Sequence, residues 1–319
     1  MSTDPTTRVR LGTTSLEVTR LGLGTAPLGD LYEAVADDVA EATVTTAIDL
    51  GLGLVDTAPL YGNGSAERRI GRALASVEHG SVIVATKVGR LLRSIDGAEV
   101  SPVFDFSYDG VMRSVEESLE RLGLDRVDIL HIHDPDDHHD EALEGAYAAL
   151  DQLRSEGSIG AVGAGMNQAE MLARFAREGD FDCFLLAGRY TLLDQGGLAE
   201  LLPACLERDI SIIAGGVYNS GLLADPRPGA RFDYEPASAA LVARAVHLRE
   251  VCDRHGVPLK AAAIQFPLGH PAVATVVIGA RSPAELTENV AMFRHPIPAA
   301  LWDELRAERL LAEEVPTPR

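Results

Sequence analysis

The stretch LGLVDTAPLYGNGSAERRIGRAL, residues 52–74, is the part of the sequence that decides the expected fold. Its apolar run ends at Asp56, a loop rich in glycine, asparagine and proline then carries Tyr61, and a helix-like segment begins at Ser65. This order predicts a strand, a loop and a helix, with two polar side chains just past the strand. An acid or a tyrosine in such a place is often structural, so the neighbouring strands must decide whether it marks a site.

The alternation of strand and helix recurs along the whole chain of 319 residues. Eight short apolar runs are expected to be strands, at residues 21–25, 52–56, 81–87, 126–133, 159–164, 182–187, 210–214 and 273–278. Short apolar runs are typical of parallel strands that are buried on both faces. Because no flexible linker divides the chain, we predict one α/β domain over residues 1–319. It is a (β/α)8 TIM barrel with an N-terminal β-hairpin around residues 12–14 and extra C-terminal helices.

The rival architecture is a doubly wound dinucleotide-binding sheet. Its glycine fingerprint would have to be the run from Gly22 to Gly29, but the third glycine is wrongly spaced and Pro27 stands where a helix should begin. In the barrel, by contrast, the connections 88–109 and 215–235 both lie on the C-terminal face, where barrel enzymes place their sites. Connections of this length that lack secondary structure of their own usually have a function.

Composition excludes several classes of function. The formal charge of −20 argues against nucleic-acid partners and anionic membranes, since both need a basic surface. No apolar segment approaches the ~20 residues of a membrane span. The N-terminal MSTDPTTRVR lacks the apolar core of a secretion signal, and three scattered cysteines suit a reducing compartment. We therefore expect a cytoplasmic protein; the oligomeric state is not predicted.

Polar residues follow three successive strands at the same relative position. Asp56 and Tyr61 follow the second strand, Lys87 ends the third and His133 ends the fourth. Alternation of side chains places Asp56, Lys87 and His133 in phase, pointing into the barrel. Each residue alone is explained by a purely structural role, but together at consecutive strand ends they favour a catalytic site.

These residue types suit the interconversion of a carbonyl and an alcohol. A tyrosine phenol has an ordinary pKa of about 10, and a neighbouring Lys87 ammonium is expected to lower it by favouring the phenolate. Asp56 can hold Lys87 in place, and His133 can orient the substrate oxygen. The result is a proton donor and acceptor aimed at one oxygen, which needs a separate hydride carrier.

The segments DTAPLYGNGSAERRIG, VATK, HIHDPD and GAGMN, in this order, resemble the aldo-keto reductase superfamily. The likeness extends from about residue 11 to 293. More narrowly, LLAGRYTLLDQ, IIAGGVYNSGLL and VVIGARSPAELTENVAMF are similar to the branch that holds D-threo-aldose 1-dehydrogenases (L-fucose dehydrogenases) and pyridoxal 4-dehydrogenases. The resemblance implies that Tyr61 is the general acid/base, Lys87 its tuner, Asp56 the partner of Lys87 and His133 the substrate-orienting group. His131 is expected to lie deeper and to be structural.

The resemblance also implies a nicotinamide cofactor. The positions that match its binding site, or whose glycines allow close backbone approach, are Gly24, Thr25, Asn167, Gly215, Gly216, Gly221, Gly279, Arg281, Glu285 and Asn289. Gly279 and Glu285 stand where many relatives hold the 2′-phosphate of NADP with basic side chains. We therefore expect NAD, with NADP as the alternative because Arg281 could pair with a phosphate. Met166, Ala187 and Gly215 depart from the family pattern around the nicotinamide ring, where Tyr218 is a substitute.

The expected function is an NAD(P)-dependent oxidation of an aldose to its lactone. The alternatives are reduction of aldehydes or ketones and oxidation of pyridoxal by the same machinery, or, in a different class, a nucleotide-sensing binding module. The expected partner is a small sugar or aldehyde. The run DDHHD at residues 136–140 is interpreted as an exposed loop, so no metal is expected. Arg90 and Arg93 either meet the substrate or close the loop after Lys87.

Overall fold

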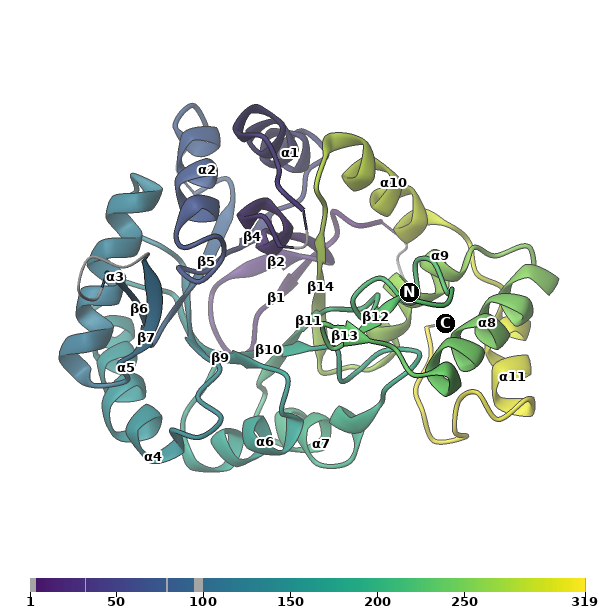
Figure 1. The fold of residues 1–319 in the computed structure, drawn as a ribbon. Coiled ribbons are helices and arrows are strands. Elements are labelled where there is room, and N and C mark those ends of the chain that lie inside the picture. Colours follow the sequence, from purple (N-terminus) through teal and green to yellow (C-terminus); the bar gives the residue numbers. More distant parts are fainter. Residues whose placement is uncertain (1–3, 32, 79, 95–99, 319) are drawn as a thin grey trace.

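The structure is a computed structural model that describes residues 4–31, 33–78, 80–94 and 100–318. Eight strands close into a parallel barrel in the order β10-β11-β14-β3-β4-β5-β8-β9, and helices surround it (Figure 1). The barrel strands are β3 (Leu21–Gly24), β4 (Leu54–Asp56), β5 (Ile83–Val88), β8 (Ile129–His133), β9 (Ala161–Met166), β10 (Cys183–Ala187), β11 (Ser211–Gly215) and β14 (Val273–Gly279). This closure confirms the predicted (β/α)8 barrel.

The helices follow the predicted order along the chain. They are α1 (Asp37–Asp49), α2 (Ser65–Leu74), α3 (Tyr108–Leu122), α4 (His139–Glu141), α5 (Ala148–Ser155), α6 (Ala169–Glu178), α7 (Leu201–Glu207), α8 (Ala239–Arg254), α9 (Leu259–Gln265), α10 (Pro283–Arg294) and α11 (Ala299–Ala307). Serine side chains begin α3, α8 and α10 by accepting a backbone N–H of the first turn. A π-helical turn, Ala142–Tyr147, lies between α4 and α5.

The extra C-terminal helices predicted from the sequence are present. Helix α11 packs against α8 beside the barrel, and Arg254 Nε of α8 donates to Glu304 Oε1 of α11 over 2.7 Å. Figure 1 shows both helices at one side of the molecule, outside the ring. They are therefore an addition to the barrel and lie away from its strand ends.

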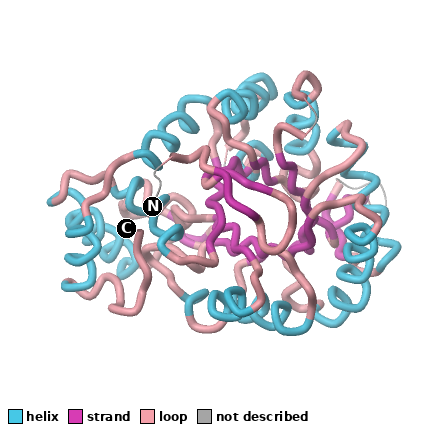
Figure 2. Tube along the Cα trace, turned by 180° about the vertical axis from the view of Figure 1, so that it is seen from behind, coloured by secondary structure: helices cyan, strands magenta, loops and turns pink. Residues whose placement is uncertain are grey.

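The N-terminal hairpin closes one end of the barrel. Strand β1 (Arg8–Arg10) pairs with β2 (Glu17–Thr19) in antiparallel register, and the hairpin faces the reader in Figure 2. Its Leu11 and Val18 belong to the same buried cluster as the inward-facing Leu54, Ala85 and Ile129 of three barrel strands. Burial of these apolar side chains excludes water from that end, so the opposite, C-terminal end is the one left open for a site.

The two long connections differ from the sequence expectation, because each forms a small hairpin. Strand β6 (Arg90–Arg93) pairs with β7 (Ser101–Phe104), and β12 (Arg231–Phe232) pairs with β13 (Glu235–Pro236). Residues 95–99 of the first connection lie outside the described residues. The sequence lacked a sign of either hairpin because strands of two to four residues carry too little periodicity to detect. Figure 1 places the hairpins on opposite sides of the barrel opening.

Two further observations concern membranes and cysteines. In the part of the chain that the structure describes, no helix is both long and apolar enough to cross a membrane. Cys183, Cys205 and Cys252 are buried free thiols, and burial raises the pKa of each above its ordinary value. All three therefore stay protonated and serve as small apolar side chains of the interior.

Candidate functional site

Asp56, Lys87 and Tyr61 meet at the C-terminal end of the barrel, as the sequence predicted. The Lys87 ammonium donates to both carboxylate oxygens of Asp56, over 2.9 and 2.8 Å, and to the carbonyl oxygen of Thr57 over 2.8 Å. The Lys87 and Asp56 side chains are only 1% and 6% exposed. Lys87 Nζ also lies 4.9 Å from the centre of the Tyr61 ring. Three acceptors and a phenol therefore surround one buried ammonium.

The pKa of Tyr61 contradicts the expectation from the sequence. Burial raises the pKa of Tyr61 to about 12, although the nearby Lys87 ammonium opposes this change. The negative charge of Asp56 adds to the increase. The loss of water around the phenol disfavours its charged form more strongly than the ammonium favours it. Tyr61 is therefore a protonated donor at neutral pH.

Lys87 keeps its charge despite its burial. Burial alone would lower the pKa of Lys87, but the Asp56 carboxylate and the Tyr61 phenol raise it above its ordinary value. Burial raises the pKa of Asp56 as well, and the Lys87 ammonium opposes that change. We treat the pair as an ion pair at neutral pH because the two charges are in direct contact with good hydrogen-bond geometry.

His133 lies beside Tyr61, with the two rings edge to face and their centres 6.0 Å apart. Burial holds the pKa of His133 well below its ordinary value, and the charges of Lys87 and Arg90 lower it further. The ring is therefore neutral. Its Nε2 is 3.5 Å from Asp134 Oδ2, and its Nδ1 has no hydrogen-bond partner among the described residues. A neutral ring with an unpaired nitrogen next to the phenol can orient an uncharged oxygen.

His131 is inside the barrel wall, as expected. It pairs with Lys87 across β5 and β8 and is fully buried. Burial and then the Lys87 charge lower the pKa of His131 to about 3, so the ring is neutral. Gly163 makes room for it, because a Cβ there would lie 2.3 Å from His131 Nδ1.

The helical part of the opening stretch anchors the site. Glu67 of α2 is buried, and it accepts from Thr86 Oγ1 over 2.7 Å and from Arg121 Nε over 2.6 Å. Arg69 of the same helix donates to carbonyl oxygens of the loop after β3, at Leu28 and Val35. Neither residue was predicted from the sequence. They tie α2 to its neighbours and hold the loop that borders Tyr61.

That loop approaches Tyr61 very closely at Gly29. A Cβ at Gly29 would lie 2.5 Å from the Tyr61 carbonyl carbon and 2.9 Å from the Tyr61 Cβ. Any larger residue would therefore push the two loops apart. In the sequence, Gly29 was only the wrongly spaced third glycine of a possible dinucleotide-binding fingerprint. No local pattern indicated its contact with Tyr61.

A cavity of about 680 Å³ extends from Tyr61 across the ends of β3, β11 and β14. Eleven of the predicted site residues line it: Gly24, Thr25, Asp56, Tyr61, Asn167, Gly215, Gly216, Gly221, Gly279, Arg281 and Glu285. Lys87 and His133 contact Tyr61 but do not belong to the lining. Gly216 and Gly221 have φ angles of 63° and 93°, a conformation that favours glycine.

Asn289 is the predicted site residue that the structure does not bring to the cavity. It is 1% exposed, accepts from the Tyr218 hydroxyl over 3.2 Å and donates to the Gly279 carbonyl oxygen over 3.4 Å. Tyr218 itself lines the cavity, and its ring has Lys260 Nζ 5.8 Å from its centre. Asn289 therefore contacts the cavity only through Tyr218 and Gly279, and its role in cofactor binding stays a prediction.

Arg281 is occupied by two carboxylates at the far end of the cavity. Its guanidinium donates to Glu33 Oε2 over 2.7 Å and to Glu285 Oε2 over 3.4 Å. Its backbone N–H also donates to Glu285 Oε2, over 2.8 Å. Glu33 was missed from the sequence, because 248 residues separate it from Arg281. The cavity end therefore carries more negative than positive charge.

The remaining candidates are engaged with other side chains. Arg90 Nη2 donates to Asp134 Oδ2 over 2.6 Å, and its guanidinium lies 4.8 Å from the centre of the Phe104 ring. Arg93 pairs with Glu117 over 2.9 Å. In the run at residues 136–140, His138 packs on Phe104 with ring centres 5.1 Å apart. Within the described ranges, no group of three or more ligating side chains is placed to hold a metal.

Similarity to known proteins shows the family of this chain. A profile of the aldo/keto reductase family matches residues 20–308. The chain belongs to the aldo/keto reductase family. It is 42% identical to a pyridoxal 4-dehydrogenase of Microbacterium luteolum, over 95% of this chain and 97% of that one. It is also 42% identical to a D-threo-aldose 1-dehydrogenase of a Pseudomonas species, over 95% and 96% of the two chains.

Solved structures of the family have the same fold. An aldo-keto reductase from Bacillus halodurans superposes with a TM-score of 0.78 at 28% identity, over 97% of both chains. A glycerol dehydrogenase from Gluconobacter oxydans gives a TM-score of 0.77 at 23% identity, over 100% of this chain and 98% of that one. The sequence-based assignment to this family and to an oxidoreductase is confirmed. The protein is therefore an oxidoreductase enzyme of this family.

Proposed function

We propose that this aldo/keto reductase is an NAD-dependent dehydrogenase that oxidises the anomeric hydroxyl of an aldose to the lactone. The observation that carries the proposal is the contact of Tyr61 with the buried Lys87–Asp56 pair and with neutral His133 at one end of a cavity large enough for a cofactor. The similarity to a D-threo-aldose 1-dehydrogenase supports the substrate class.

The four residues at the strand ends have separate roles in the proton transfer. Tyr61 Oη accepts the proton of the sugar hydroxyl as the C–H bond of the anomeric carbon breaks, and the lactone carbonyl forms. Tyr61 must first lose its own proton, and the Lys87 ammonium stabilises the resulting phenolate. Asp56 keeps Lys87 charged and in place. The neutral His133 ring donates a hydrogen bond that orients the sugar oxygen.

The cavity residues fit a nicotinamide dinucleotide. Three glycines at strand ends and loop turns, Gly24, Gly216 and Gly221, expose backbone to the cavity. Asn219 is 3% exposed and lines the cavity, and its Oδ1 lacks a hydrogen-bond partner among the described residues. A buried unpaired acceptor of this kind can accept from a donor group of a ligand. The chemistry supplied there would be acceptance of the hydride.

NAD is the favoured cofactor because of the charge at the far end of the cavity. Glu33 and Glu285 both contact Arg281, so the guanidinium of Arg281 is already paired. A 2′-phosphate would have to compete with these carboxylates and would be repelled by them. A ribose 2′-hydroxyl, in contrast, can donate to a carboxylate oxygen. We therefore expect higher kcat/KM with NAD than with NADP.

The second candidate is oxidation of pyridoxal, favoured by the equal identity to a pyridoxal 4-dehydrogenase. The same Tyr61 machinery would accept its hydroxyl proton, and run in reverse it would reduce aldehydes or ketones. Location in the cytoplasm and the absence of nucleic-acid partners stay predictions.

The test is the absorbance of reduced nicotinamide with the purified enzyme, a panel of aldoses, pyridoxal, and both oxidised cofactors. We expect turnover with an aldose and NAD. Tyr61→Phe removes only the phenol hydroxyl, so it should lower kcat by at least about a hundredfold while the affinity for NAD stays within about twofold. The catalytic assignment fails if the phenylalanine variant keeps wild-type turnover. The substrate assignment fails if pyridoxal is oxidised and no aldose is.

A further inference from the structure

The hairpin β12–β13 at the edge of the cavity has an unusual turn. Two residues, Asp233 and Tyr234, connect its strands, with φ angles of 50° and 67°. Two positive φ angles are the pattern of a type I′ turn, which strongly prefers Asn-Gly or Asp-Gly. The aspartate fits this preference. A tyrosine in the second position does not, because a bulky side chain with positive φ is strained.

Several contacts hold the strained turn in place. Arg189 forms a two-pronged ion pair with Asp233, over 2.9 and 2.7 Å. The backbone N–H of Tyr234 donates to Ser220 Oγ over 3.2 Å, and its carbonyl oxygen accepts from Arg231 over 3.0 Å. A strained residue that is fixed on three sides is typical of ligand-binding segments. The contacts position Tyr234 with little freedom in its backbone.

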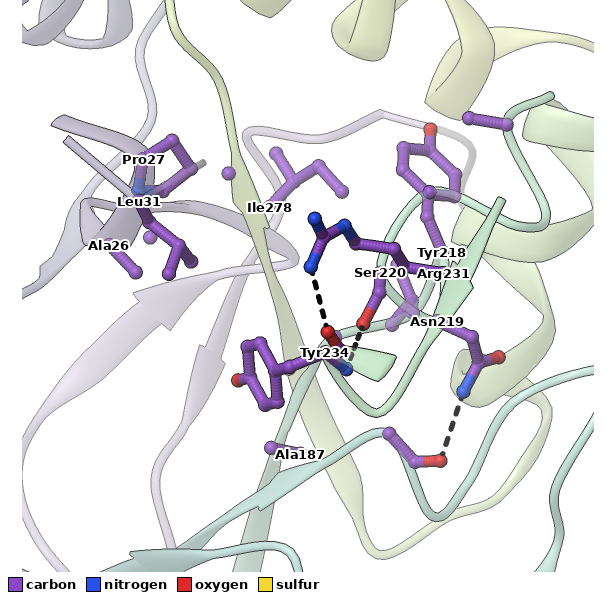
Figure 3. A pocket seen from close by; sticks show the side chains of 18 of the residues that line it. Ala26, Pro27, Leu31, Ala187, Tyr218, Asn219, Ser220, Arg231, Tyr234 and Ile278 are labelled. Carbon is purple, nitrogen blue, oxygen red and sulfur yellow. Dashed lines mark hydrogen bonds between the residues drawn. The ribbon is translucent and has the colours of Figure 1, made fainter. Parts of the chain in front are cut away.

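The Tyr234 ring projects into the cavity. Figure 3 shows it pointing away from the hairpin, above Ala187 and towards the side lined by Leu31. Tyr234 and Tyr61 line the same cavity. The aromatic side chain of Tyr234 is nevertheless 52% exposed. The charge of an ionised Tyr234 would raise the pKa of Tyr61, so the two phenols are near enough to interact. The ring of Tyr234 therefore lies near the end of the cavity that contains Tyr61.

We propose that Tyr234 binds the substrate, by covering the bound sugar with its ring above Tyr61. This inference rests on the proposed function and adds a residue for substrate affinity that is separate from the proton transfer. An aldose in its ring form has faces of C–H groups and a rim of hydroxyls. A tyrosine matches both, with an apolar ring face and a polar tip. The need for this ring explains why the turn carries tyrosine where glycine would be unstrained.

The experiment compares Tyr234→Gly with Tyr234→Phe. The glycine variant suits the type I′ turn, so its Tm should be equal to or above that of the wild type, while KM for the aldose rises about tenfold from the loss of the apolar contact. Its kcat and its Kd for NAD, measured by titration in the absence of sugar, should change less than twofold. The phenylalanine variant keeps the ring and should keep KM within about threefold.

Asp209→Gly is the matched control. Asp209 is exposed, has a φ angle of 55° and precedes β11, on the face of the barrel opposite the cavity. The control should leave KM unchanged. The inference is overturned if Tyr234→Gly keeps the wild-type KM, or if it weakens NAD binding as much as it raises KM, since the ring would then cover the cofactor. If the wild type oxidises no aldose, the proposed function itself fails, which is a different result.

Discussion

Replacement of Asp56 by asparagine tests the buried ion pair most directly. Asparagine has nearly the shape of aspartate, but it removes the negative charge and turns an NH2 group towards the Lys87 ammonium. Lys87 then keeps only one of its two carboxylate-type acceptors and the carbonyl oxygen of Thr57. With both side chains almost fully buried, water cannot replace what is lost.

The expected loss of stability is large. Breaking a buried ion pair by removing one partner costs about 3–5 kcal/mol, against a total of about 5–15 kcal/mol for a typical protein. This corresponds to a fall in Tm of roughly 10 °C. We also expect at least a hundredfold loss of kcat, because the phenolate of Tyr61 is no longer stabilised.

The pH dependence gives a sharper signature. In the wild type, the pKa of Lys87 is higher in the folded protein than in the unfolded chain. This difference contributes stability that is fully present below the unfolded pKa of about 10.4 and is lost as the pH rises through the folded pKa. In Asp56→Asn, burial is no longer opposed by the carboxylate and should place the pKa of Lys87 below about 10.4. The folded variant then binds fewer protons than the unfolded chain, so its stability should rise with pH up to about 10.4.

The assay is urea unfolding at pH 7 and pH 9.5, with kcat measured in parallel. Asp37→Asn is the matched control, because Asp37 pairs with Arg69 and Arg72 but its side chain is 63% exposed. That exposed network should lose no more than about 1 kcal/mol. If Asp56→Asn is as stable as this control and its stability does not rise between pH 7 and pH 9.5, the reasoning from burial is refuted.

Two other predictions concern pH and cofactor choice. With the pKa of Tyr61 raised to about 12, kcat for oxidation should rise about tenfold per pH unit between pH 7 and 9, while kcat for reduction stays nearly flat; a flat oxidation profile would exclude Tyr61 as the proton acceptor. Replacing Glu33 and Glu285 together by glutamine should raise kcat/KM for NADP relative to NAD by about tenfold, because Arg281 loses both charged partners. An unchanged ratio of the two cofactors would contradict the role given to these carboxylates.

Much of the candidate site could be read from position in the sequence. Asp56, Lys87 and His133 end consecutive strands, and the ends of parallel neighbouring strands must lie side by side on one face. Their inward direction followed from the alternation of side chains along a strand. The proximity of Tyr61 followed from its distance of five residues from Asp56. Each of these inferences uses only local geometry and the order of strands.

Other features depended on contacts between distant segments. Glu33 and Arg281 are 248 residues apart, and no local pattern connects them. Asn289 carries the right residue type for the cavity, but its side chain is buried against Tyr218 and the Gly279 carbonyl. The strained turn at Tyr234 follows from a hairpin whose strands have two residues each, and such short strands leave no periodic signal.

The sequence by itself determined which groups meet: the alternation of strands and helices predicted the barrel, and the barrel brings Asp56, Lys87, Tyr61 and His133 together. Only the tertiary structure decided their chemical states. The pKa of Tyr61 is raised although Lys87 is adjacent, because the energy of a charge depends on how completely the surrounding chain excludes water. Exclusion of water is a property of the packed molecule as a whole, and no single stretch of sequence contains it.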